Sequence, residues 1–223
     1  MASCANDPNC CLAVALTSSS HGADVNSYEK EGRKIPLRLY DQDQGFDRTY
    51  LPPHLGPRHI FAYPGANAEG VFTKLQEELQ PGRWPFKYHR FYVMAGSNRD
   101  IAEYDTKGAK RSAAAVSAIV NFIESDAFLC DGGRVKVILP PPRRTYYADA
   151  YGKYLKDLHK ELLKRLTADV YNSHHIVRGW YLSTTQEMQE PFSANPAVMY
   201  DDVHLNKDGY RVLQDFLLSY EMR

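Results

Sequence analysis

Two polar stretches near opposite ends of this sequence contain residue types that together can catalyse acyl transfer. The run Ser18-Ser19-Ser20-His21 follows an apolar segment, and the carboxyl-terminal stretch DDVH places Asp201 three residues before His204. A serine hydroxyl becomes an effective nucleophile when a histidine removes its proton, and that histidine needs a carboxylate to orient it. The pattern therefore predicts Ser20 as the nucleophile, His204 as the general base and Asp201 as the carboxylate.

Two further loops contain groups that could stabilise the oxyanion of the tetrahedral intermediate. Gly65 lies in the stretch PGAN, and Asn98 lies in the stretch GSNRD. A backbone N–H and a side-chain amide are suitable donors, each worth about 3 kcal/mol of transition-state stabilisation. Both residues also have a structural interpretation, because Gly65 could simply form a turn and Asn98 could cap the next helix.

These loops need a scaffold that brings them together, and the remaining sequence predicts a mainly parallel sheet. Short apolar runs alternate with longer amphipathic segments, which is typical of βαβ units. The expected strands are 11–17, 59–64, 90–96, 134–140 and 174–182. The expected helices are 67–79, 107–125, 147–167 and 206–220. Because ligands of such sheets bind beyond the carboxyl ends of the strands, the loops that follow the strands are expected to form one site.

The four loops resemble the conserved blocks of the SGNH (GDSL-like) hydrolases, which carry serine, glycine, asparagine and histidine in that chain order. YPGANAEG resembles the second block, AGSNRD the GxND-like third block and DDVHLNKDGY the last, while Ser20 aligns with the nucleophile. The resemblance implies a flavodoxin-like, three-layer α/β/α sandwich with about five strands in the order 2-1-3-4-5. It also implies a serine esterase that cleaves an acetyl or longer acyl ester without a cofactor.

The first block departs from the family pattern, because the chain has SSSH where the family has GDSH. The change leaves the nucleophile in place but removes the glycine and the aspartate that shape its loop. The alternative is therefore a catalytically silent interaction module of the same fold. A weaker similarity to esterase-like domains beside retrotransposon and viral proteins suggests a mobile-element setting for such a module. Ser18 or Ser19 would replace Ser20 in another register, and Asp202 is the alternative carboxylate.

Other groups could recognise a ligand or partner. Arg143 and Arg144 follow the fourth expected strand and are either a solvated pair or a site for an anionic part of the substrate. Metal catalysis is not favoured, because His174 and His175 are adjacent on an expected strand and would point to opposite faces. A balance of 27 basic and 27 acidic residues gives no strong indication of nucleic-acid binding. The expected partner is a small-molecule, lipid or carbohydrate ester, and the oligomeric state is left open.

Length and composition predict a single domain over residues 1–223. Within it, the polar stretch 22–58 is interpreted as an irregular excursion between the first two strands, and both it and 187–200 could border a pocket. No apolar run approaches the roughly 20 residues of a membrane span, and the first apolar run fits a strand better than a secretory signal. The four cysteines lack a CxxC pair, so a soluble, intracellular and reducing location is expected, with a Cys4–Cys10 bridge left open.

Overall fold

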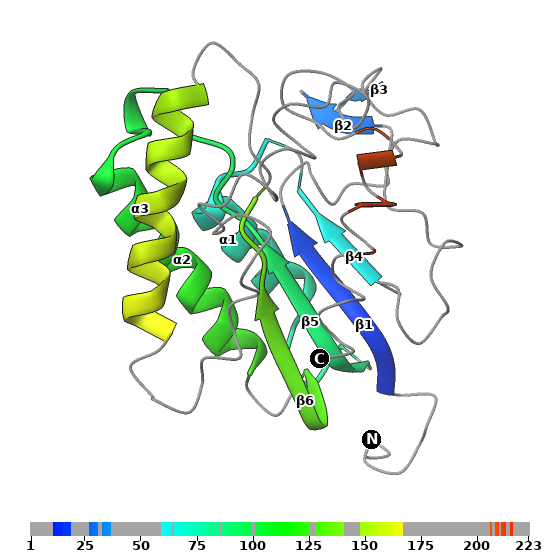
Figure 1. Cartoon of the computed structure of the whole chain (residues 1–223). Coiled ribbons are helices and arrows are strands. Elements are labelled where there is room, and N and C mark those ends of the chain that lie inside the picture. Colours follow the sequence, from blue (N-terminus) through cyan, green and yellow to red (C-terminus); the bar gives the residue numbers. More distant parts are fainter. Residues whose placement is uncertain are drawn as a thin grey trace.

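The structure, a computed structural model, has a four-stranded parallel sheet with the strand order β4-β1-β5-β6 (Figure 1). It describes residues 11–18, 27–30, 33–36, 59–63, 65–84, 86–99, 101–124, 128–140 and 148–166, and single positions between 206 and 215. The strands are β1 (Cys11–Ser18), β4 (His59–Ala62), β5 (Lys87–Met94) and β6 (Leu129–Val137). This order matches the one expected for the first four strands, whereas the fifth, 174–182, lies outside the described residues.

The sheet is covered on both faces, as a three-layer sandwich requires. Side chains of neighbouring strand residues point to opposite faces, yet every residue from Phe91 to Ser97 is buried. Phe91, Val93 and Met94 are fully buried, and Tyr92 is nearly so. The centre of β5 is therefore apolar on both sides, and the prediction of an α/β fold with a parallel sheet is confirmed.

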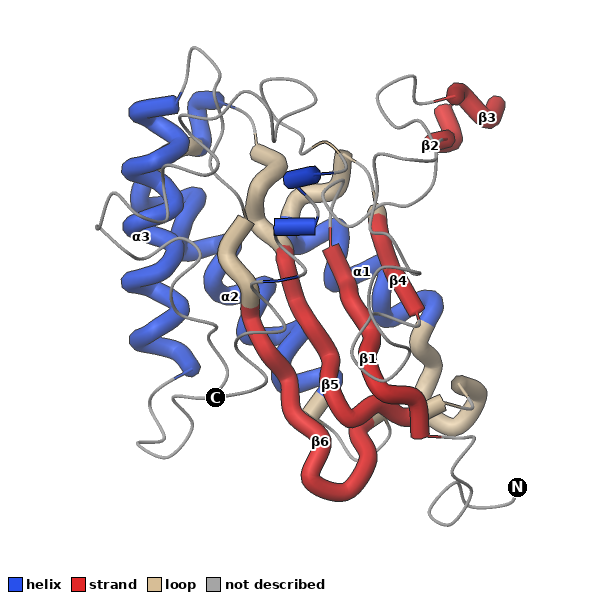
Figure 2. Tube along the Cα trace, turned by 45° about the vertical axis from the view of Figure 1, so that its right-hand side comes forward, coloured by secondary structure: helices blue, strands red, loops and turns tan. Residues whose placement is uncertain are grey.

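Three helices follow the strands and pack as the sequence predicts. They are α1 (Ala68–Glu78), α2 (Thr106–Ile123) and α3 (Ala148–Leu166), with a short 3₁₀ helix η3 (Ile101–Glu103) ahead of α2. The buried stripe of α2 is rich in small residues, which lets α3 pack closely against it, as Figure 2 shows from the side. Asn67 and Asp105 are the N-caps of α1 and α2.

Two elements differ from the expectations. The last strand begins at Leu129, five residues before the expected 134, because Leu129 pairs with Tyr88 and a register shift accommodates the glycine-rich stretch before Arg134. Within the polar stretch 22–58, β2 (Ser27–Lys30) and β3 (Arg33–Pro36) form an antiparallel hairpin, so this stretch is not wholly irregular.

The described residues of the carboxyl-terminal segment have helical backbone at 208, 209, 211, 212 and 215. The Asn206 side chain accepts a hydrogen bond from the Gly209 N–H at 3.0 Å, which is the geometry of a helix N-cap. Val212 packs against the hydrophobic core. In Figures 1 and 2 this segment, red in Figure 1, lies at the end of the sheet where β1 and β4 finish.

The cysteine interpretation needs a correction. Cys130, on β6, is disulfide-bonded. Because disulfides persist in oxidising compartments, this bond is at odds with the reducing location expected from the cysteine pattern. The side chains of Cys4, Cys10 and Cys11 lie outside the described part of the structure. Among the described helices, none is long and apolar enough to cross a membrane.

Candidate active site

The site begins with three strands that finish at the same level. Ser18, the last residue of β1, pairs with Ala62 of β4 on one side and with Met94 of β5 on the other. The chain therefore leaves β1 between the loop that contains Gly65 and the loop that contains Asn98. Ser20 follows Ser18 by two residues, so the serine run starts at the centre of this edge, although Ser20 itself lies outside the described residues.

Gly65 lies on a tight turn between β4 and α1. The Ala66 N–H donates to the Tyr63 carbonyl at 3.0 Å, which closes a β-turn over residues 63–66. Gly65 is the third residue of this turn and has φ +80°, a conformation that favours glycine in a type II turn. Gly65 is exposed, and α1 begins three residues later behind the N-cap Asn67. The turn and the proposed oxyanion role of Gly65 are compatible.

Asn98 lies on the loop that follows β5 and is half-buried. The alternative role of Asn98 as cap of the following α-helix does not hold, because Asp105 is the N-cap of α2 and accepts from the Gly108 N–H at 2.7 Å. Just before Asn98, Gly96 has φ +102°, and its carbonyl accepts a hydrogen bond from the Tyr154 hydroxyl at 2.7 Å. The backbone at the start of this loop is thus held from α3.

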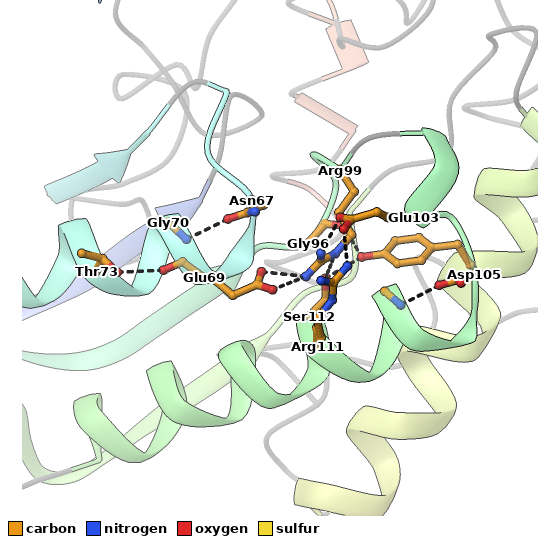
Figure 3. Close-up of polar contacts among 12 residues, drawn as sticks. Asn67, Glu69, Gly70, Thr73, Gly96, Arg99, Glu103, Asp105, Arg111 and Ser112 are labelled. Atoms are coloured by element: carbon orange, nitrogen blue, oxygen red, sulfur yellow. Dashed lines mark hydrogen bonds and ion pairs between the residues drawn. The ribbon is translucent and has the colours of Figure 1, made fainter.

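Beside Asn98, the sequence analysis missed a buried charge cluster centred on Arg99 (Figure 3). The Arg99 side chain is only 1% exposed, and its guanidinium forms ion pairs with Glu69 and Glu103. Burial lowers the pKa of Arg99, but the hydrogen bonds to these carboxylates raise it more strongly in sum, so the net direction is upward. Arg99 therefore stays charged, and no spacing rule connects residues 69, 99 and 103 in the sequence.

The remaining predicted site residues lie outside the described residues: Ser20, Asp201, His204, Arg143 and Arg144. The structure does constrain where the last block leads, because the Asn206 cap lies two residues after His204. The histidine thus comes just before a helix whose residue Val212 packs on the core. This is the arrangement that the DDVHLNKDGY pattern predicts for its helix.

Two rival groups have structural roles. His59 lies at the amino end of β4, away from the edge where the strands finish, and its Nδ1 is 2.5 Å from the Tyr88 hydroxyl. Aromatic rings surround it, including Trp84 and Phe86. Ser112 is fully buried on α2 and is hydrogen-bonded to Arg99 and Tyr154. Within the described ranges, no three His, Cys, Asp or Glu side chains are grouped to hold a metal ion.

Solved structures of esterases and lipases share this fold. The acetyl xylan esterase AlAXEase matches with a TM-score of 0.55 at 13% identity, over 92% of this chain and 98% of its own. A member of the lipolytic G-D-S-L family from Veillonella parvula DSM 2008 matches with a TM-score of 0.54 at 15% identity, over 94% and 98%. A carbohydrate acetylesterase family member from Sinorhizobium meliloti gives 0.52 at 15%, over 92% and 94%.

No protein-family model and no curated protein matches the chain. At 13% to 15% identity, what the chain shares with these three structures is the fold. The matches nevertheless extend over nearly the whole of both chains, so the shared fold includes the strand ends at which the candidate residues lie.

Proposed function

We propose that this chain, which has the fold of the SGNH (GDSL-like) hydrolases, is a serine esterase that cleaves a carboxylic ester. The observation that carries the proposal is the level finish of β4, β1 and β5. Because Ser18 pairs with the last residues of both neighbours, the serine run leaves the sheet between the two loops that contain Gly65 and Asn98. A nucleophile and two oxyanion donors need this juxtaposition.

In the proposed reaction, Ser20 Oγ attacks the acyl carbon while His204 takes the hydroxyl proton, and Asp201 orients the imidazole. The carbonyl oxygen becomes an oxyanion that accepts hydrogen bonds from the Gly65 N–H and the Asn98 amide. The intermediate collapses when His204 delivers its proton to the leaving alcohol, which forms an acyl enzyme. Water, deprotonated by His204, then attacks the acyl carbon, releases the acid and restores Ser20.

The substrate class is an ester with an acetyl or longer acyl group on a small molecule, a lipid or a carbohydrate. Two of the matched structures are an acetyl xylan esterase and a carbohydrate acetylesterase family member, so acetylated sugars come first in a substrate panel. Arg143 and Arg144 follow β6 and the extended, buried residues Ile138 and Leu139 in the sequence, and would contact an anionic portion of the substrate.

The alternative is a catalytically silent module with the same fold. The sequence feature that favours it is the SSSH block, which lacks the glycine and the aspartate of the family pattern. The two functions differ in one measurable property, which is turnover that depends on the serine hydroxyl.

The test measures hydrolysis of nitrophenyl acetate and acetylated sugars by the purified chain and by Ser20→Ala. The esterase predicts a rate that rises with pH as His204 loses its proton, near an ordinary histidine pKa of about 6.5, and its loss in Ser20→Ala. Ser18→Ala and Ser19→Ala are matched controls, which should retain activity and which also test the register. A folded wild-type chain without turnover on any ester of the panel would favour the silent module.

A further inference from the structure

The Arg99 guanidinium is fully used by three acceptors from three separate elements (Figure 3). One terminal nitrogen donates to both carboxylate oxygens of Glu69, at 2.5 and 2.7 Å, and the other to Glu103 at 2.9 Å. Nε donates to Ser112 Oγ at 2.7 Å. Such a planar fork fixes the orientation of the side chain, because each nitrogen has its own partner in a different direction.

The elements that contribute these acceptors surround the carboxyl ends of β4 and β5. Glu69 lies in the first turn of α1, Glu103 ends η3 and Ser112 is on α2. The network continues to α3, since Ser112 Oγ and the Tyr154 hydroxyl are 2.7 Å apart and that hydroxyl donates to the Gly96 carbonyl. One connected set of polar contacts therefore runs from α1 to α3.

Both candidate oxyanion donors are adjacent to this set in the chain. Asn98 immediately precedes Arg99, and Gly65 lies four residues before Glu69, on the turn that leads into α1. The two donors belong to loops after different strands, which β1 separates in the sheet. The Arg99–Glu69 ion pair is thus a direct bond between the segments that contain these donors.

We propose that Arg99 is a positioning residue for the oxyanion-binding loops, with Glu69 as its partner on α1. The ion pair holds the Gly65 turn and the Asn98 loop at a fixed separation, so that both donors face the developing oxyanion without reorganisation. This inference rests on the proposed esterase function, which it deepens by naming the groups that set the geometry of the site. Arg99 contacts no substrate in this account and acts through Asn98 and Gly65.

The first test is kinetic and compares Arg99→Met with Arg111→Met. Arg111 also contacts Glu103, but its side chain is 54% exposed and it has no printed contact with Glu69, so it is a matched control. We expect Arg99→Met to lower kcat about 10- to 100-fold with a change in KM below about threefold, because transition-state stabilisation is lost. The pH midpoint of the rate should not move, and Arg111→Met should stay within about twofold of wild type.

A double-mutant cycle separates positioning from general destabilisation. If Arg99 acts through Asn98, adding Arg99→Met to Asn98→Ala should lower kcat by less than about threefold further, because the donor is already absent. Arg99→Lys, which keeps the charge but loses the fork, should fall between wild type and Arg99→Met. Independent, multiplying effects of the two substitutions would overturn the proposal.

The second test needs no activity and uses hydrogen–deuterium exchange in peptides covering 65–70 and 96–99. Glu69→Gln, a milder change at a side chain that is 42% exposed, and Arg99→Met should each raise exchange in both segments, whereas Arg111→Met should not. Exchange that rises in only one segment, or in neither, would refute the coupling. If the wild-type chain has no serine-dependent turnover, the esterase proposal fails, and the exchange result still decides whether Arg99 couples the loops.

Discussion

Glu103 is held in its charged form by two arginines on opposite sides of the loop after β5. Its pKa is lowered first by the hydrogen bond from Arg111 and then by the one from Arg99. The Arg99 pKa is raised in sum, as described above. At the residue scale, the charges beside Asn98 therefore persist through the neutral and mildly acidic range in which a histidine base would titrate.

Substituting Glu103 should change how stability depends on acid. A carboxyl group whose pKa is lowered in the folded state stabilises the fold above its ordinary pKa, and that stability is lost as pH falls through the folded value. Below pH 4.5 we therefore expect wild type to lose stability more steeply than Glu103→Gln. Urea midpoints of both proteins at pH 7 and at pH 3 measure the difference. Equal losses in the two proteins would show that Glu103 contributes nothing to acid sensitivity.

Asn98→Ala tests the side-chain donor itself. If its amide stabilises the oxyanion, kcat should fall about 100-fold or more while the thermal midpoint changes little. Asn121, an exposed residue of α2, is the matched control, and Asn121→Ala should leave kcat within about twofold of wild type. A rate of Asn98→Ala close to that of the control would remove Asn98 from the oxyanion site.

At the scale of elements, the loop after β5 is packed between α2 and α3. A Cβ at Gly96 would lie 3.2 Å from Leu158 Cδ2 and 3.5 Å from both Ser112 Cβ and the Tyr154 hydroxyl. The residue also has φ +102°, which side-chain-bearing residues rarely adopt. The close packing and the backbone conformation both require glycine at this position.

Gly96→Ala should destabilise the protein by about 1–3 kcal/mol, because strain and crowding act together. Gly152, within α3, is the matched control, since a Cβ there would meet nothing within 4 Å. Gly152→Ala should stabilise the helix by about 0.5–1 kcal/mol through its higher helix propensity. Urea denaturation of both variants measures the two changes. Similar effects of the same sign would contradict the packing argument.

At the scale of the whole molecule, the sheet is a hydrophobic core that also carries a covalent link. The core residues of β5 are buried on both faces, and Cys130 at the amino-terminal half of β6 is disulfide-bonded. The other three cysteines of the chain all lie within its first 11 residues. We therefore expect the bond to close a loop of more than 100 residues, which restricts the unfolded chain strongly.

Reduction of this bond should lower the free energy of unfolding by about 2–4 kcal/mol. Thermal unfolding with and without a phosphine reductant measures the effect, and Cys130→Ser should unfold at the same temperature in both conditions. Peptide mapping without reduction should link Cys130 to Cys4, Cys10 or Cys11. A midpoint of the wild-type chain that does not respond to the reductant would show that the bond does not form in solution.

What the sequence determined by itself was the order of elements, because that order depends on local periodicity. Apolar runs and amphipathic stripes predicted β1, β4, β5 and the three helices α1 to α3 within a few residues, and their order implied the strand arrangement. Gly65 and Asn98 were predicted at strand ends and lie there, while their catalytic roles stay predictions. Ser20, Asp201 and His204 lie outside the described residues.

Tertiary structure alone decided which distant groups meet. The early start of β6 depends on pairing with Tyr88, and the β2–β3 hairpin depends on pairing between two polar segments, so neither has a periodic signal. The Arg99–Glu69 ion pair joins residues 30 positions apart and from different elements. Local sequence cannot encode such a contact, because its existence depends on how α1, β5 and α2 pack and on the absence of water between them.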